Sequence, residues 1–108
     1  MTHDKLSMNS APVIFDLGNN NRLTEAQVIA IFNEVENQPK IIVVNTAVPR
    51  DWREANNELI AKYAEKFHAI LIDWNAISHG QPEYFAPDGV HLVPAGVRVY
   101  VEAISEQL

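Results

Sequence analysis

Short, continuous apolar runs separate longer segments of helical spacing along this chain. The apolar runs lie at residues 13–17, 40–46 and 69–73, and each has the length of a strand. Ile41-Ile42-Val43-Val44 is continuous rather than alternating, which predicts a strand buried on both faces. This longest apolar run is far shorter than a membrane-spanning segment.

Helical spacing follows the first two strands and returns near the end of the chain. Thr24 with Gln27 is a capping-box signature, and Asp51 with Glu54 indicates a second capped helix. Pro94 is suited to the first position of a closing helix. The expected core faces of these helices are Val28, Ile31, Phe32 and Val35; then Trp52, Ala55, Leu59, Tyr63 and Phe67; then Val97, Val101 and Ile104.

The element order is strand, helix, strand, helix, strand, long loop (residues 74–93) and helix. Strands that alternate with helices pair in parallel through right-handed crossovers, so the predicted class is α/β. At 108 residues the chain is one domain or part of one. Residues 1–11 are polar and aperiodic, and we expect a disordered leader or a remnant of cloning there, followed by the domain at 12–108.

The amino-acid composition excludes several kinds of functional site. The chain has no cysteine, which excludes disulfides, thiolate catalysis and cysteine-based zinc sites. Its formal net charge is −6, with 8 basic and 14 acidic residues, which argues against a nucleic-acid surface and favours solubility.

Asp88 and His91 lie three residues apart in the turn-forming stretch Ala86-Pro87-Asp88-Gly89-Val90-His91. A carboxylate at this spacing can hold one imidazole nitrogen and leave the other free to accept a proton from a nucleophile. Considered alone, the same two residues are better explained as a turn aspartate with a surface histidine.

Three segments reach the carboxyl edge of the predicted sheet, where open parallel sheets form their sites. The first strand delivers Gly18, Asn19 and Asn20, and the second delivers Asn45 and Thr46. The third opens into residues 74–93, which contain Asp88 and His91. The sequence therefore predicts a site where these segments meet.

Three blocks in this order carry a family resemblance: Val13-Ile14-Phe15-Asp16-Leu17-Gly18-Asn19-Asn20, Val44-Asn45-Thr46-Ala47-Val48-Pro49-Arg50 and Glu83-Tyr84-Phe85-Ala86-Pro87-Asp88-Gly89-Val90-His91-Leu92. Gly18-x-Asn20 and Asp88-x-x-His91 resemble the third and fifth blocks of SGNH (GDSL-type) hydrolases. The fuller pattern is similar to the extracytoplasmic SGNH domain of bacterial peptidoglycan O-acetyltransferases of the acyltransferase-3 type. The resemblance runs from about Val13 to the C-terminus.

The resemblance implies a role for each matching residue. His91 is the implied general base, and Asp88 fixes its tautomer and stabilises the imidazolium. Asn20 donates its amide to the oxyanion with a backbone N–H of Gly18 or a neighbour, and Gly18 lets the backbone approach the acyl group. The implied reaction is acetyl transfer through an acyl-serine, to water or to a muramic acid hydroxyl, without metal or cofactor.

The chain departs from the family in one large respect. The opening strand, the Gly-Asp-Ser turn with its nucleophile and the second block would precede this chain, and Ser7, Ser10, Ser78 and Ser105 lack the matching context. The expectation is a truncated three-layer α/β/α fold of about three strands, inactive alone. An uncovered sheet edge would favour self-association.

The implied partners are an acetylated glycan or small acyl ester and a missing N-terminal half of the domain. The implied location is outside the membrane on a membrane-anchored parent, with no membrane contact by this segment. The alternative function is a non-catalytic glycan- or protein-binding module on an SGNH-derived fold.

Several residues admit two interpretations from sequence. Asn20 suits either an oxyanion site or a turn, and Asn19 and Asn21 leave the register open. Arg50 and Trp52 could line a substrate groove, although the spacing of Trp52 favours the core. Trp74 is as compatible with the site border as with the core. A metal site would recruit His79, Glu83, Asp88 and His91, but their spacing does not favour one.

Overall fold

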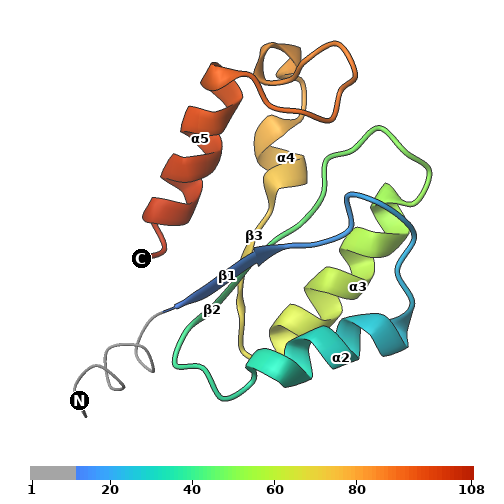
Figure 1. Ribbon diagram of the computed structural model, residues 1–108, viewed down its shortest axis with the longest axis vertical. Helices are drawn as coiled ribbons and strands as arrows, with labels where there is room; N and C mark the ends of the chain where they lie inside the picture. The colour runs from blue at the N-terminus through green and yellow to red at the C-terminus, as the bar shows by residue number, and fades with distance from the viewer. Residues whose placement is uncertain (1–11) are drawn as a thin grey trace.

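The computed structural model describes residues 12–108, in which three parallel strands form a sheet with helices on both faces (Figure 1). The strands are β1 (Val13–Asp16), β2 (Ile41–Val44) and β3 (Ile70–Ile72), in the spatial order β1-β2-β3. The register aligns Ile14 with Ile42, and Ile42 with Ile70. All three predicted strands are confirmed, each shorter than its apolar run. The leader expected at residues 1–11 lies outside the described residues.

The longer helices are α2 (Glu25–Val35), α3 (Arg53–Lys66) and α5 (Pro94–Ser105). The prediction of an unbroken loop at residues 74–93 was wrong, because it contains α4 (Trp74–Ser78) and the 3₁₀ helix η1 (Pro82–Tyr84). α4 begins there because the Asp73 carboxylate accepts a hydrogen bond from the Ala76 N–H at 3.1 Å. The expected start of α5 at Pro94 is confirmed.

Helices α2 and α3 cover one face of the sheet (Figure 1). The capping box is confirmed: the Gln27 N–H donates to Thr24 Oγ1 at 3.1 Å, and the Thr24 N–H donates to Gln27 Oε1 at 2.9 Å. It sets the helix so that Val28 and Phe32 are fully buried against the sheet.

Helix α5 covers the opposite face, over a cluster that contains Ile42, Val44, Ile72 and Trp74. β2 is buried along its whole length, as its continuous apolar run predicted. The molecule therefore has three layers, α/β/α, and the predicted α/β class is confirmed.

The predicted core face of α3 was only partly right. Tyr63 is buried, but the other fully covered side chains are Asn56, Ile60 and Ala64. The predicted cap was also wrong, since the N-cap residue is Trp52 and makes no side-chain capping bond. Compared with the predicted face, α3 is rotated about its axis so that Asn56 points inward. Its side-chain amide has backbone hydrogen-bond partners there.

The predicted core face of α5 was wrong for two of its three residues. Val97 and Val101 are 45% and 52% exposed, whereas Val99, Tyr100, Ala103 and Ile104 pack against the sheet. Gly96 explains the rotation: a Cβ there would lie 2.2 Å from the Tyr84 carbonyl oxygen. The glycine side of α5 therefore faces inward against η1. Apolar residues on both sides of α5 made its spacing ambiguous.

The edge of β1 is not paired by another strand among residues 12–108. Val13 and Leu17 donate their N–H groups to the Lys40 and Val44 carbonyls, so by alternation the backbone groups of Ile14 and Asp16 point to the open edge. Ile14 is 42% exposed there. An open edge with exposed apolar side chains is a template for association.

We predict that the chain self-associates through this edge and the exposed valines of α5. Val101→Lys should lower the dimer fraction, because it puts a charge on the apolar surface. The matched control is Glu102→Lys, one residue along the same helix. Analytical ultracentrifugation over a concentration series measures the effect, and a monomer at every concentration would refute the prediction.

Candidate active site

A cavity of about 450 Å³ lies beyond the carboxyl ends of the strands, at the edge predicted to hold the site. We call it the His91 cavity. Its walls come from the loop after β1, the loop after β2, the segment around residue 90 and helix α5. The lining residues are Asp16, Asn19, Asn20, Asn45, Ala47, Val48, Trp74, Phe85, Val90, His91, Leu92, Val97 and Tyr100.

Asp88 and His91 lie in a closed hairpin of residues 85–92. Phe85 and Leu92 form an antiparallel bridge, and the Ala86 N–H donates to the His91 carbonyl at 2.8 Å. Gly89 has φ of +73°, which favours glycine, and its N–H donates to the Ala86 carbonyl at 2.9 Å. This short turn brings the two side chains together.

One Asp88 oxygen contacts His91 Nδ1 at 2.5 Å. The other accepts hydrogen bonds from the N–H groups of Val90 and His91 at 2.8 and 3.0 Å. The bond from His91 and these two backbone bonds lower the pKa of Asp88 from 3.8 to about 2. Asp88 therefore remains a carboxylate at neutral pH and can hold the imidazole by Nδ1.

The His91 side chain is 81% exposed. Its Nε2 has no hydrogen-bond partner among residues 12–108 and so remains available to a reacting group. The hairpin also contacts the loop after β2, because a Cβ on Gly89 would lie 3.0 Å from Pro49 Cγ. The arrangement supports proton transfer at an accessible imidazole nitrogen.

Asn20 and Asn19 both line the His91 cavity, whereas Gly18 does not. Gly18 is buried behind the loop with φ of +91°, and a Cβ there would lie 3.2 Å from Thr46 Cγ2. Backbone geometry and close packing thus favour glycine at this position, and its contact with an acyl group stays a prediction. Asn20 is exposed at the cavity wall.

Asn56 holds the loop that carries these asparagines. Its side chain is fully buried, and Nδ2 donates to the Gly18 and Asn21 carbonyls at 3.2 and 2.9 Å. Its Oδ1 accepts from the Leu23 N–H at 2.9 Å. Sequence reasoning missed this residue, although an Asn-Asn pair inside a helix is a signal, because asparagine disfavours helix interiors.

Asn57 holds the second loop in the same way. Its amide exchanges two hydrogen bonds with the backbone of Thr46, at 3.0 and 2.8 Å. Neighbouring residues of α3 therefore fix the loops after β1 and β2, which form two walls of the cavity.

The back of the cavity is built from Asn45, Trp74 and Tyr100. Asn45 is buried, donates to the Asp73 carboxylate at 2.9 Å and accepts from the Asn75 N–H at 3.0 Å. Trp74 is buried and lines the cavity, so both interpretations of this residue hold. Burial and the nearby Asp16 carboxylate raise the pKa of Tyr100, which donates to Asp16 at 3.3 Å.

Other candidate residues lie elsewhere. Ser78 is buried and its Oγ donates to the Trp74 carbonyl at 2.7 Å, so it is not placed as a nucleophile. Neither Arg50 nor Trp52 lines the His91 cavity. Ser7 and Ser10 lie outside the described residues. The lining residues include no serine, threonine or cysteine from residues 12–108.

Within residues 12–108, no group of three histidine, cysteine or carboxylate side chains could hold a metal ion. His79 lines a neighbouring cavity and Glu83 is exposed on η1. Over the same residues, no helix combines the length and apolar character needed to cross a membrane.

Curated relatives match nearly the whole chain. It is 38% identical over 103 residues to the peptidoglycan O-acetyltransferase OatA of Listeria monocytogenes, covering 95% of this chain and 16% of the relative. It is 39% identical over 107 residues to the putative O-acetyltransferase SAS0844 of Staphylococcus aureus, covering 98% of this chain and 18% of the relative. For the putative peptidoglycan O-acetyltransferase YrhL of Bacillus subtilis the identity is 36%, covering 89% of this chain and 15% of the relative.

Among solved structures, the esterase domain of the ORF1 protein from the zebrafish ZfL2-1 retrotransposon is similar, with a TM-score of 0.61 and 19% identity. The match covers 77% of this chain and 55% of that domain, and it supports the fold alone. No family model matches the chain. The resemblance inferred from the three sequence blocks is confirmed, and the chain spans less than a fifth of the length of these curated relatives.

The hydrogen bond from His91 is the largest cause of the low pKa of Asp88. We predict that His91→Ala raises this pKa from about 2 toward 3.8, with the two backbone bonds retaining part of the shift. In the unchanged chain the carboxylate should lose its contacts only as the pH falls through about 2. Carboxyl ¹³C NMR titration measures the Asp88 pKa in the unchanged chain and in His91→Ala, with His68→Asn as control. An unchanged Asp88 midpoint in His91→Ala would contradict the prediction that the hydrogen bond from His91 lowers this pKa.

Asn56→Ala should lower the free energy of unfolding by about 1–3 kcal/mol, because buried backbone groups of the first loop lose their partner. Asn33→Ala, at an exposed position of α2, is the control and should change it by less than about 0.5 kcal/mol. Urea unfolding followed by circular dichroism compares the two. Equal effects would show that the buried amide does not hold the loop.

Proposed function

We propose that this chain, as a relative of one segment of the bacterial peptidoglycan O-acetyltransferases, supplies the acid–base part of an acyl-ester site that transfers acetyl groups on cell-wall glycan. The observation that carries the proposal is the contact of 2.5 Å between Asp88 Oδ2 and His91 Nδ1. His91 lines a cavity of about 450 Å³. The relatives' names support the glycan and the acetyl group.

His91 Nε2 accepts the proton of the attacking hydroxyl, and that oxygen bonds to the acyl carbon. Asp88 stays ionised, holds the Nδ1 tautomer and stabilises the imidazolium. When the tetrahedral intermediate collapses, His91 returns the proton to the leaving oxygen. In each half of the reaction, His91 therefore takes up one proton and releases one proton.

Asn20 donates its side-chain amide to the oxyanion, from the wall of the cavity that His91 also lines. Asn19 lies on the same wall, but its amide lies 3.5 Å from the Asp16 carboxylate, which favours Asn20 for the oxyanion role. The loop is already fixed by the buried Asn56, so the donor needs little reorganisation.

The nucleophilic hydroxyl comes from a segment outside residues 12–108, because no serine or threonine of these residues lines the cavity. The chain matches only 15–18% of the length of its relatives, which leaves room in such proteins for this segment. By the same relationship, the site would act outside the membrane on a membrane-anchored parent. Alone, the chain would not turn over an ester.

A second candidate function is a glycan- or protein-binding module without catalysis. The lack of a serine or threonine in the lining from residues 12–108 favours it. Saccharide binding that survives His91→Ala, together with no acetyl transfer in any context, would support this function over the first.

The test places residues 13–108 in the Listeria relative in place of its homologous segment. His91→Ala should lower acetyl transfer to glycan about 10²–10⁴-fold, because a general base is removed. Asn20→Ala should lower kcat about 10²–10³-fold through loss of an oxyanion donor. Release of acetate after alkaline treatment of the purified glycan measures the product.

His68→Asn is the control in the same hybrid protein, since His68 lies at the end of α3, away from the cavity, with φ of +57° that asparagine tolerates. A hybrid that transfers acetyl groups equally well with and without His91 would overturn the proposed function.

A further inference from the structure

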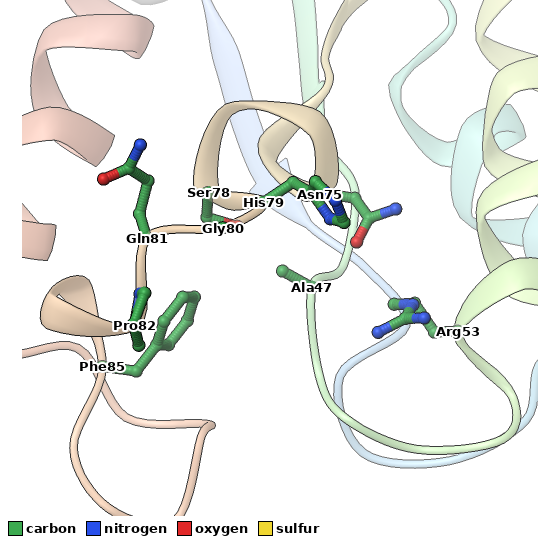
Figure 2. A pocket seen from close by; sticks show the side chains of 9 residues that line it. All are labelled: Ala47, Arg53, Asn75, Ser78, His79, Gly80, Gln81, Pro82 and Phe85. Atoms are coloured by element: carbon green, nitrogen blue, oxygen red, sulfur yellow. The ribbon is translucent and has the colours of Figure 1, made fainter.

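A second cavity, of about 310 Å³, adjoins the His91 cavity, and Ala47 and Phe85 line both. We call it the Arg53 cavity, and Figure 2 shows the side chains that line it. Arg53 contributes from the start of α3, and the segment from Asn75 to Phe85 contributes most of the remaining wall. A ligand that fills the His91 cavity can therefore extend past Ala47 and Phe85 toward Arg53.

Arg53 brings an unpaired positive charge to this cavity. Its side chain runs from the helix toward Ala47 (Figure 2). Its Nε is buried and has no hydrogen-bond partner among residues 12–108, and the ion pairs of this part of the chain do not include its guanidinium. None of the residues that line the cavity is acidic. A buried donor without a partner is costly, so an anion that accepts a hydrogen bond from it would be bound favourably.

The wall shared by the two cavities indicates what carries the anion. Ala47 and Phe85 offer only apolar side chains there. Pro82 and Phe85 lie on one side of Ala47, and Arg53 lies on the other (Figure 2). The path from His91 to Arg53 is therefore apolar in the middle and cationic at its far end. Such a path suits a short chain of methylene groups that ends in a carboxylate, which a planar guanidinium can bind through two parallel hydrogen bonds.

We propose that the two cavities together take esters whose acyl chain ends in a carboxylate, such as a succinyl ester, with the carboxylate on Arg53 and the ester carbonyl beside His91. This rests on the proposed function, which places the ester at His91, and it extends that function from acetyl groups to dicarboxylic acyl groups. Arg53 acts as a specificity-determining residue and takes no part in proton transfer. Arg50, the other arginine of this region, is exposed and donates to the Pro49 carbonyl at 3.1 Å.

The bonds that form and break are those of acetyl transfer. The oxygen of the nucleophilic hydroxyl bonds to the ester carbon of the succinyl group, and the bond from that carbon to the leaving oxygen breaks. His91 takes the proton of the hydroxyl and gives it to the leaving oxygen. The second half repeats this exchange with an acceptor hydroxyl or water as the attacking group. The terminal carboxylate stays ionised throughout, and its pair with Arg53 holds the acyl chain in place.

Because the chain alone would not turn over an ester, its binding can be measured with intact ligands. The experiment titrates the 108-residue chain with monomethyl succinate and with methyl succinamate, in which a neutral amide replaces the carboxylate. NMR follows the Arg53 Nε–H signal and the His91 ring signals. Monomethyl succinate should bind about tenfold more tightly, because only the carboxylate forms a charge-assisted pair, and it should shift both sets of signals.

Arg53→Gln should remove this preference, so that the two esters bind alike. Arg50→Gln is the matched control and should keep the preference. Ala47→Leu tests the connection between the cavities with Arg53 intact, because a larger side chain on the shared wall should weaken the binding of monomethyl succinate and reduce its effect on the His91 ring.

The proposal is overturned if the two esters bind equally well, if Arg53→Gln retains the preference, or if monomethyl succinate shifts the Arg53 signal without the His91 ring. In the hybrid protein, Arg53→Gln should lower the ratio of acyl transfer from nitrophenyl succinate to that from nitrophenyl acetate about tenfold. Selective binding by the chain without transfer in the hybrid protein would refute the proposed function alone. Acetyl transfer that depends on His91, without selective binding, would refute this inference alone.

Discussion

The site depends on one buried amide. Asn56 is fully enclosed, yet its hydrogen bonds to Gly18, Asn21 and Leu23 satisfy three backbone groups of the loop after β1. A buried polar side chain stabilises a fold only when it is satisfied in this way. Because α3 also holds the next loop through Asn57, a single helix fixes two walls of the His91 cavity relative to each other.

The third wall of the His91 cavity, the hairpin that carries Asp88 and His91, forms without hydrogen bonds from α3. The hairpin of residues 85–92 closes on itself through local hydrogen bonds, and the Asp88–His91 pair forms within it. Its position in the molecule comes from two close approaches, of Gly89 to Pro49 and of Gly96 to the Tyr84 carbonyl. The acid–base pair thus forms locally, and close packing at the two glycines positions it beside the cavity.

The close approach of Gly96 to the Tyr84 carbonyl also determines which apolar residues of α5 remain exposed to solvent. With Gly96 against η1, α5 turns Val99 and Tyr100 to the sheet and leaves Val97 at the cavity rim and Val101 beyond it. Val97 lines the cavity together with Asp16, the last residue of β1, and β1 has no second partner strand within residues 12–108.

The sequence by itself determined what depends on short-range physics: three apolar runs gave parallel strands, the Thr24–Gln27 box gave α2, and the spacing of Asp88 and His91 allowed their contact. Only the tertiary structure decided the faces of α3 and α5, since apolar residues on more than one side left the rotation open. It also decided that Arg53, rather than Arg50, reaches a cavity. Packing against distant backbone makes these choices, and such contacts join residues too far apart in sequence for any spacing to encode.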